Sequence, residues 1–113
     1  MKTFTVKKPW GQFDQFTHNE ISTVKILSVN SNSSLSLQYH NDRTEFWRVI
    51  SGHPLITIGE TKKSANPGEE FIIEKLELHQ LEAQDDDVQV LEIAFGNFDE
   101  EDIVRIKDKY GRA

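Results

Sequence analysis

The sequence predicts an all-β protein in which short strands form a sandwich or a barrel. Apolar residues recur mostly with a period of two, which is the spacing of side chains on one face of a strand. Turn-forming residues interrupt the chain at roughly regular intervals, a pattern typical of both architectures. With 113 residues, the chain has room for one domain, residues 1–113, with one modest core.

Seven segments have the alternation or the apolar composition of strands, and turn signals separate most of them. The predicted strands are 21–29, 35–40, 45–50, 55–58, 71–73, 79–83 and 88–95. In the first of them Val24 and Ile26 share one face. The turns include the polar run 30–34 and the stretch Asn66-Pro67-Gly68.

The second predicted strand has one apolar and one polar face. Its apolar residues are Leu35, Leu37 and Tyr39, and these alternate with Ser36, Gln38 and His40. A barrel interior lined by ligand-binding side chains would explain a polar face in such a strand.

The end of the chain changes its period. Ile103, Ile106 and Tyr110 are spaced i, i+3, i+7, which predicts a short amphipathic helix over residues 99–110. We expect Asn97 or Asp99 to cap its start and the glycine at position 111 to end it.

Composition excludes several classes of protein. The net charge of −6 argues against general nucleic-acid or membrane binding, and the absence of cysteine excludes disulfides and thiolate ligands. The first residues lack the apolar core of a signal peptide, and no stretch reaches transmembrane length. We therefore expect a soluble cytoplasmic protein.

Four side chains have the chemistry of metal ligands. Gln38 and His40 are two residues apart, so on a strand they point to the same face. Glu45 follows after a short polar turn, and His79 lies in a distant segment that only the fold can bring near. Imidazole nitrogens and carboxylate or amide oxygens are donors that zinc, manganese or iron accept.

Motifs along the whole chain resemble one family. Residues 35–40 with Arg43, Glu45, Trp47 and Gly52 resemble the first cupin motif, and residues 68–79 resemble the second. Three flanking segments complete the set of motifs. They are residues 8–13, Lys-Pro-Trp-Gly-Gln-Phe, residues 101–105, Glu-Asp-Ile-Val-Arg, and residues 108–112, Asp-Lys-Tyr-Gly-Arg. Together they are similar to the cupin domain of type II phosphomannose isomerases, the mannose-6-phosphate isomerase/mannose-1-phosphate guanylyltransferase family, as a stand-alone cupin.

The resemblance implies a fold and an activity. The fold would be a single cupin barrel with a short C-terminal helix, and the activity would be a metal-dependent interconversion of mannose 6-phosphate and fructose 6-phosphate. The alternatives are a non-catalytic cupin that binds metal and a sugar phosphate, and a metal-dependent oxygenase. A homodimer is expected, with the N-terminal segment 3–6 contributing to its interface.

The resemblance also implies roles for individual residues. Gln38, His40, Glu45 and His79 would hold the metal, with zinc as the first expectation and manganese, cobalt, nickel or iron as alternatives. Arg43 would serve in catalysis and, together with Arg105, in binding the substrate phosphate.

The chain departs from the family pattern around the expected pocket. Asn41 and Asp42 replace part of a histidine-rich run, and Ala83 stands where an asparagine is usual. Glu74 and Leu76 stand where the loop before the last ligand usually has a proline and a glycine. Isomerisation also needs a proton-transfer base, which the sequence does not identify. Asp42 and Glu74 are candidates because they are expected near the pocket mouth.

Overall fold

The structure, a computed structural model, describes residues 3–96 and 98–107, and this part of the chain is all-β, as predicted. The strands are β1 (Phe4–Lys8), β2 (Gly11–Gln15), β3 (Ser22–Val29), β4 (Leu37–Tyr39), β5 (Thr44–Ser51), β6 (Leu55–Ile58), β7 (Thr61–Ser64), β8 (Glu70–Ile73), β9 (His79–Glu82), β10 (Val88–Phe95) and β11 (Val104–Lys107). Within the described ranges, no helix is long and apolar enough to cross a membrane.

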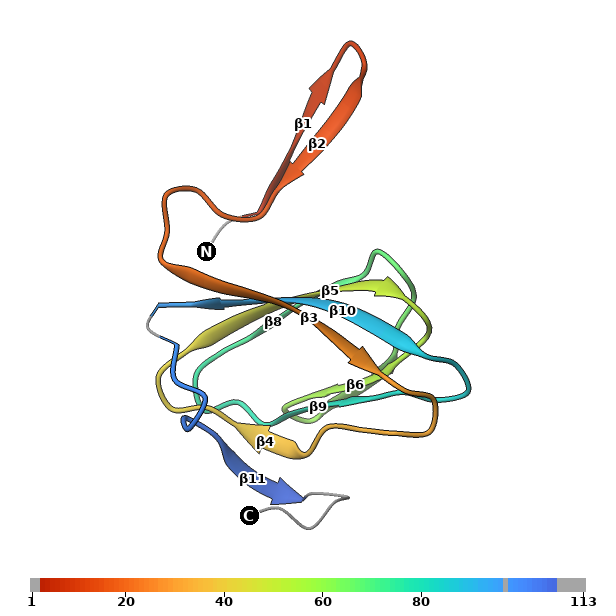
Figure 1. The fold of residues 1–113 in the computed structure, drawn as a ribbon, viewed down its shortest axis with the longest axis vertical. Coiled ribbons are helices and arrows are strands. Elements are labelled where there is room, and N and C mark those ends of the chain that lie inside the picture. The colour runs from red at the N-terminus through yellow and green to blue at the C-terminus, as the bar shows by residue number, and fades with distance from the viewer. Residues whose placement is uncertain (1–2, 97, 108–113) are drawn as a thin grey trace.

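Two antiparallel sheets face each other and enclose the interior. One sheet has the strand order β3-β10-β5-β8 and the other β11-β4-β9-β6-β7. Figure 1 shows these sheets as the two walls of a flattened barrel. A separate hairpin, β1 paired with β2, projects away from the barrel at the N-terminal end of the described chain (Figure 1).

Alternation along the strands separates the core from the surface. Trp47 and Val49 of β5 and Val90 of β10 point inward from one sheet, while Ile56 of β6 and Leu81 of β9 point inward from the other. All five are at most 1% exposed. Burying a large apolar side chain contributes roughly 1.5–3 kcal/mol, so these contacts hold the two sheets together.

The face that Val24 and Ile26 share is the outer face of the four-stranded sheet. Both side chains are 58% exposed, and Ile72 of β8 on the same face is 50% exposed. Phe46 also points outward, yet it is buried because the ring of Phe16 packs on it, with ring centroids 5.5 Å apart.

Gly52 allows β5 to end against the turn between β9 and β10. Its φ is +81°, in the left-handed region, and a Cβ at this position would lie 2.2 Å from the carbonyl oxygen of Asp87. Only glycine fits both the backbone angle and the space.

The predicted C-terminal helix was wrong. Residues 99–103 form a turn and an extended stretch, and β11 then pairs antiparallel with β4, with Val104 opposite Tyr39 and Arg105 opposite Gln38. In β11 the β-branched side chains of Val104 and Ile106 alternate with Arg105 and Lys107, which suits a strand. The free edge of β4 offers backbone partners that a local helix would leave unused. The rest of the predicted helix, with Tyr110 and its end at position 111, and the candidate cap Asn97 lie outside the described residues.

Candidate metal centre

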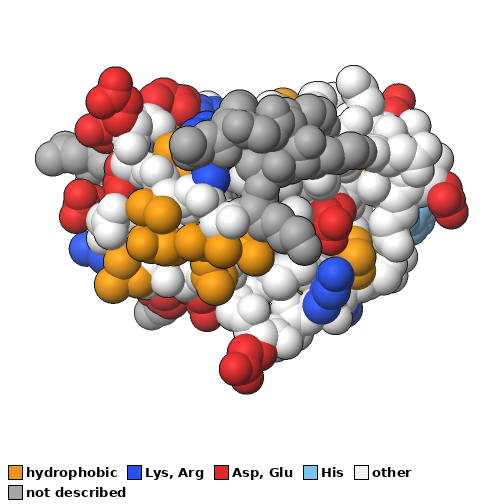
Figure 2. All heavy atoms as spheres, turned by 90° about the horizontal axis from the view of Figure 1, so that it is seen from below, with side chains coloured by type: hydrophobic (Ala, Val, Ile, Leu, Met, Phe, Trp, Pro, Cys, Tyr) orange, Lys and Arg blue, Asp and Glu red, His pale blue; other side chains and the backbone are white. Residues whose placement is uncertain are grey.

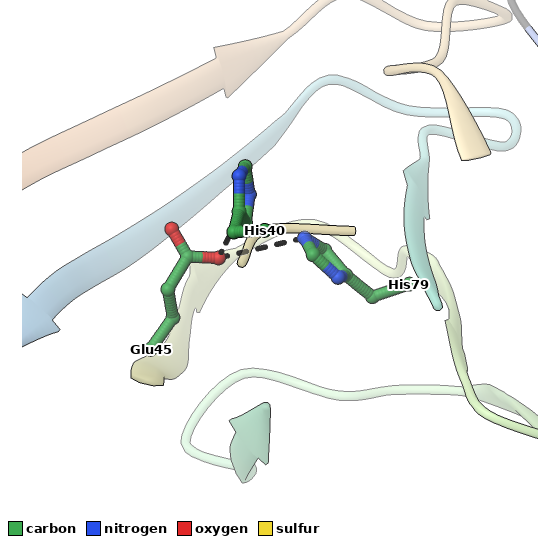
Figure 3. A group of neighbouring side chains, drawn as sticks. All are labelled: His40, Glu45 and His79. Atoms are coloured by element: carbon green, nitrogen blue, oxygen red, sulfur yellow. Dashed lines mark ion pairs between the residues drawn. The ribbon is translucent and has the colours of Figure 1, made fainter. Parts of the chain in front are cut away.

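Three of the predicted ligands meet inside the barrel. His40 directly follows β4, His79 begins the adjacent strand β9, and Glu45 comes from β5 in the facing sheet. Figure 3 shows the three side chains pointing toward one another, and each is at most 2% exposed. Strands β4 and β9 pair where Gln38 lies opposite His79, which sets both histidines on the same inner surface.

The distances suit a shared cation. Glu45 Oε1 lies 3.6 Å from His40 Nε2 and 3.5 Å from His79 Nε2. Two donors at about 2.1 Å from one tetrahedral ion lie about 3.4 Å apart. Glu45 Oε1 and His79 Nε2 are buried and have no hydrogen-bond partner within the described part of the chain. Two imidazoles and one carboxylate therefore present a donor set that fits a divalent metal.

Each histidine is held in the tautomer that a metal requires. Nδ1 of His40 donates to the carbonyl oxygen of Asp102 at 2.5 Å, and Nδ1 of His79 donates to the carbonyl oxygen of Glu77 at 2.9 Å. Because a carbonyl only accepts, Nδ1 carries the proton in both rings. The Nε2 lone pair of His79 is left facing Glu45, while that of His40 faces both Glu45 and a guanidinium nitrogen of Arg43.

Burial changes the proton affinities of all three groups. It lowers the pKa of His79 to about 4 and also lowers the pKa of His40, so both rings are neutral at neutral pH. Burial, reinforced by the neighbouring carboxylate of Glu92, raises the pKa of Glu45 to about 8. A cation at this position would therefore bind with release of the Glu45 proton.

Gln38 lies beside this trio but presents its nitrogen to it. Its Nε2 is 3.5 Å from His40 Nε2, while its Oε1 accepts a hydrogen bond from Ser36 Oγ at 2.6 Å. Turning the amide by 180° would exchange the two atoms and bring the oxygen to the metal side. The structure thus places Gln38 at the centre in the orientation that does not yet offer a ligand oxygen.

Arg43 lies inside the centre rather than at its rim. It is 7% exposed, its Nε donates to Glu45 Oε2 at 3.2 Å, and its Nη2 lies 3.2 Å from His40 Nε2. The guanidinium also donates to the carbonyl oxygen of Asp99 at 3.2 Å. Arg43 therefore hydrogen-bonds one oxygen of Glu45 and leaves the other, Oε1, directed at the histidines.

The remaining candidates fall in different places. Arg105 lies opposite Gln38 in the β11–β4 pair, so the two side chains point to the same face of the sheet. Asp42 and Glu74, the expected base candidates, are both exposed. Backbone N–H groups of Asp42 and Glu74 donate to the carboxylates of Asp102 and Glu77.

The sequence reading missed Glu92, which lies on the inner face of β10. It is 7% exposed, its Oε2 accepts a hydrogen bond from Trp47 Nε1 at 3.1 Å, and its charge contributes to the raised pKa of Glu45. Glu45 and Glu92 are the two buried carboxylates among the described residues. The missed signal was a single acid in an apolar strand, at the parity of inward-facing Val88 and Val90.

Comparisons with known proteins identify relatives over nearly the whole chain. Residues 1–108 match the family described as "Mannose-6-phosphate isomerase C-terminal". Mannose-1-phosphate guanylyltransferase ManC of Salmonella typhimurium is 33% identical over 109 residues, which cover 95% of this chain and 23% of that protein. Xanthan biosynthesis protein XanB of Xanthomonas campestris pv. campestris is also 33% identical, with the same coverage. The chain spans less than a quarter of the length of these relatives.

Solved structures with the same architecture share little sequence with this chain. The capsular polysaccharide assembling protein CapF from Staphylococcus aureus superposes with a TM-score of 0.70 at 15% identity, covering 94% of this chain and 34% of that one. A cupin protein from Bacteroides fragilis gives a TM-score of 0.60 at 21% identity, covering 69% and 70%. These likenesses confirm the predicted cupin fold. With a family match over residues 1–108, the chain belongs to the mannose-6-phosphate isomerase C-terminal family of cupin domains.

Proposed function

We propose that the chain is a metal-dependent isomerase that interconverts mannose 6-phosphate and fructose 6-phosphate. The observation that supports this most strongly is the convergence of His40, Glu45 and His79, with two buried donor atoms lacking partners in the described chain. These residues converge in a chain whose family is named after mannose-6-phosphate isomerase.

The metal would be held by His40, Glu45 and His79, with Gln38 as a fourth ligand once its amide turns over. We propose zinc, because nitrogen and carboxylate donors at this spacing suit it. A bound divalent metal would polarise the sugar carbonyl and stabilise the negative charge that develops on the sugar oxygens. Burial of the three donors excludes water that would otherwise compete for that charge.

Aldose–ketose conversion also needs a group that moves a proton. The proton leaves C2 of mannose 6-phosphate and is returned to C1, while the hydroxyl proton of O2 passes to O1, which gives the ketose. One carboxylate can accept and return the carbon-bound proton. We propose Glu92 for this step, because it is buried, points inward beside Glu45 and is oriented by Trp47 Nε1. Asp42 and Glu74 are exposed and less well placed.

Binding of the substrate phosphate requires cations near the mouth of the barrel. We propose Arg105, which lies opposite Gln38 across the β11–β4 pair, together with Arg43. Arg43 already contacts Glu45 and the carbonyl oxygen of Asp99, so it has fewer donors left for a phosphate. Fixing the phosphate would place C1 and C2 against the metal and the base.

The test is a coupled assay for fructose 6-phosphate formed from mannose 6-phosphate. The protein is assayed after treatment with chelator and after addition of zinc, cobalt or manganese. Turnover that depends on metal and is lost with chelator is expected. No turnover with any of the metals would overturn the proposed activity.

A non-catalytic cupin that binds a sugar phosphate is the second candidate. The engagement of Arg43 by Glu45 and Asp99 favours it, because a catalytic and phosphate-binding arginine needs donors directed at the substrate. Calorimetric titration of the metal-loaded protein with mannose 6-phosphate decides between the two. Binding without turnover would identify the non-catalytic protein.

We further propose that the chain forms a homodimer. Val24, Ile26 and Ile72 are exposed on the outer sheet face, and Trp10 at the tip of the projecting hairpin is 73% exposed. Figure 2 shows a further gathering of hydrophobic side chains on the face seen from below. An isolated two-stranded hairpin is marginally stable, so a partner surface would stabilise it. Light scattering should give twice the chain mass, and Ile26→Lys should lower it.

A further inference from the structure

The segment that leads from β10 into β11 lies against the candidate metal centre. The ring of Phe98 stacks on the guanidinium of Arg43, 4.5 Å from its centroid, and the carbonyl of Asp99 accepts from the same group. Glu100 pairs with Lys25, whose Nζ lies 4.3 Å from the Phe98 ring. These contacts hold the segment beside Arg43, and Figure 1 shows it running down one side of the barrel from the end of β10 to β11 next to β4.

Asp102 makes the most contacts with the ligand-bearing loop. Its Oδ1 accepts from the backbone N–H of Asn41 at 2.8 Å and from Asn41 Nδ2 at 3.2 Å. Its Oδ2 accepts from the backbone N–H of Asp42 at 3.0 Å. Both carboxylate oxygens therefore bind the turn that follows His40. Asp102 is not one of the three residues whose donor atoms converge, so it is not placed as a ligand.

The backbone of the same residue orients the ligand itself. The carbonyl oxygen of Asp102 accepts the proton of His40 Nδ1. For His79 the acceptor is the carbonyl of Glu77, only two residues away along the chain. His40 instead depends on a residue 62 positions away, so its orientation depends on this loop being held in place.

We infer that Asp102 is a positioning residue of the metal centre. Its carboxylate fastens the turn at Asn41 and Asp42, which brings its own carbonyl to His40 Nδ1. The ring is thereby kept as the Nδ1–H tautomer, with Nε2 directed at Glu45 Oε1. This inference rests on the proposed metal centre, because it assigns His40 a function as a ligand. Groups that orient a ligating histidine commonly change metal affinity by 10- to 100-fold when they are removed.

The experiment compares Asp102→Ala and Asp102→Asn with a matched control, Asp86→Ala. Asp86 also accepts from a backbone N–H and a histidine ring, both of His53, but it contacts none of the proposed ligands. Two quantities are measured for each protein. One is the affinity and visible absorption spectrum of bound cobalt(II), obtained by competition with a chelator. The other is the tautomer of His40 in the metal-free protein, obtained from long-range ¹H–¹⁵N spectra.

We expect Asp102→Ala to weaken cobalt binding by about 10- to 100-fold, to alter the absorption bands and to reduce the Nδ1–H tautomer of His40. Asp102→Asn keeps one acceptor oxygen, so its cobalt affinity should lie between those of Asp102→Ala and wild type. The control should keep the affinity and spectrum of wild type. Unchanged affinity, spectrum and tautomer in both Asp102 variants would overturn the inference.

The two readouts separate this inference from the proposed function. If the wild-type chain binds no cobalt, the metal centre is wrong, and loss of the His40 tautomer on substitution would still support the positioning contact. If Asp102→Ala does not fold, Asp102→Asn supplies both measurements. A wild-type His40 protonated at Nε2 would contradict the inference by itself.

Discussion

The backbone N–H of Leu76 donates a hydrogen bond to the carbonyl oxygen of His40, 2.8 Å away. The bond ties the loop before one proposed ligand, His79, to the strand end that bears another. Leu76 has a φ of +66°, a left-handed conformation that a side chain with a Cβ disfavours. It occupies the position where the family usually has glycine, so this chain keeps the backbone shape at the cost of strain.

Replacing Leu76 with glycine should therefore stabilise the protein. Relief of the left-handed strain contributes roughly 1–2 kcal/mol, and the extra freedom of glycine in the unfolded chain removes about half of it. Leu76 is 62% exposed, so little apolar burial is lost. We expect the free energy of unfolding, measured with urea, to rise by about 1 kcal/mol. Leu78→Gly is the control, because φ at Leu78 is not positive and the variant should be destabilised. A loss of stability in both variants would contradict the account of strain.

His79→Ala should abolish tight metal binding while the fold is retained. The substitution removes one of three converging donors and leaves His40 and Glu45 in place. We expect metal affinity to fall by at least about 100-fold, measured by metal content after dialysis and by circular dichroism for the fold. His53→Ala, at an exposed histidine paired with Asp86, should retain full metal content. Retention of metal by His79→Ala would show that the ligand assignment is wrong.

The stability of the metal-free protein should be highest between the ordinary pKa values of glutamate and histidine, 4.5 and 6.5. Below that range the unfolded chain binds more protons, because burial lowers the pKa of His40 and that of His79 in the folded state. Stability from these histidines is thus lost as the pH falls. Above pH 6.5 the folded chain binds more protons than the unfolded chain, because Glu45 keeps its proton up to about pH 8. Stability should then decline by at most about 1.4 kcal/mol per pH unit between pH 6.5 and 8.

Urea unfolding at several pH values in the presence of chelator measures this profile. Adding the metal should remove the decline above pH 6.5, because the cation displaces the Glu45 proton. Glu45→Gln should remove the decline without metal. A decline of the same slope in the Gln variant would mean that another group is responsible.

Glu92→Gln should separate proton transfer from metal binding. The amide keeps the shape of the side chain and still accepts from Trp47 Nε1, but it cannot take up a proton from the sugar. We expect kcat for mannose 6-phosphate to fall by about 10²- to 10⁴-fold with unchanged metal content. Glu74→Gln, at an exposed carboxylate, should change kcat less than about twofold. If kcat instead falls in Glu74→Gln and stays unchanged in Glu92→Gln, Glu74 is the base.

Local patterns in the sequence predicted much of the fold. The period of two located seven strands, and six of them agree within one residue with β3, β5, β6, β8, β9 and β10. The polar face of the second strand also proved to be an inner face, with Ser36 and His40 buried. These features were readable because alternation reports directly on which side of a strand is covered. The strand β7 and the β1–β2 hairpin were missed, since their residues are polar or exposed and lack that alternation.

The chain end shows where local pattern misleads. The spacing of Ile103 and Ile106 fits a helix, but Val104–Lys107 pairs with β4 because that edge would otherwise leave backbone groups unpaired. Glu92 lay in a correctly predicted strand, and its chemical importance follows only from its place beside Glu45 and Trp47 of the neighbouring strand β5.

The sequence by itself determined the strands, the inward parity of the candidate ligands and the membership of a family. Only the tertiary structure decided that Glu45 Oε1 lies between His40 and His79, and that Asp102 holds His40 from 62 residues away. The physical reason is that spacing along a strand fixes which face a side chain occupies. Distances between faces, and the burial that shifts the pKa of Glu45 and His79, depend on how the two sheets pack.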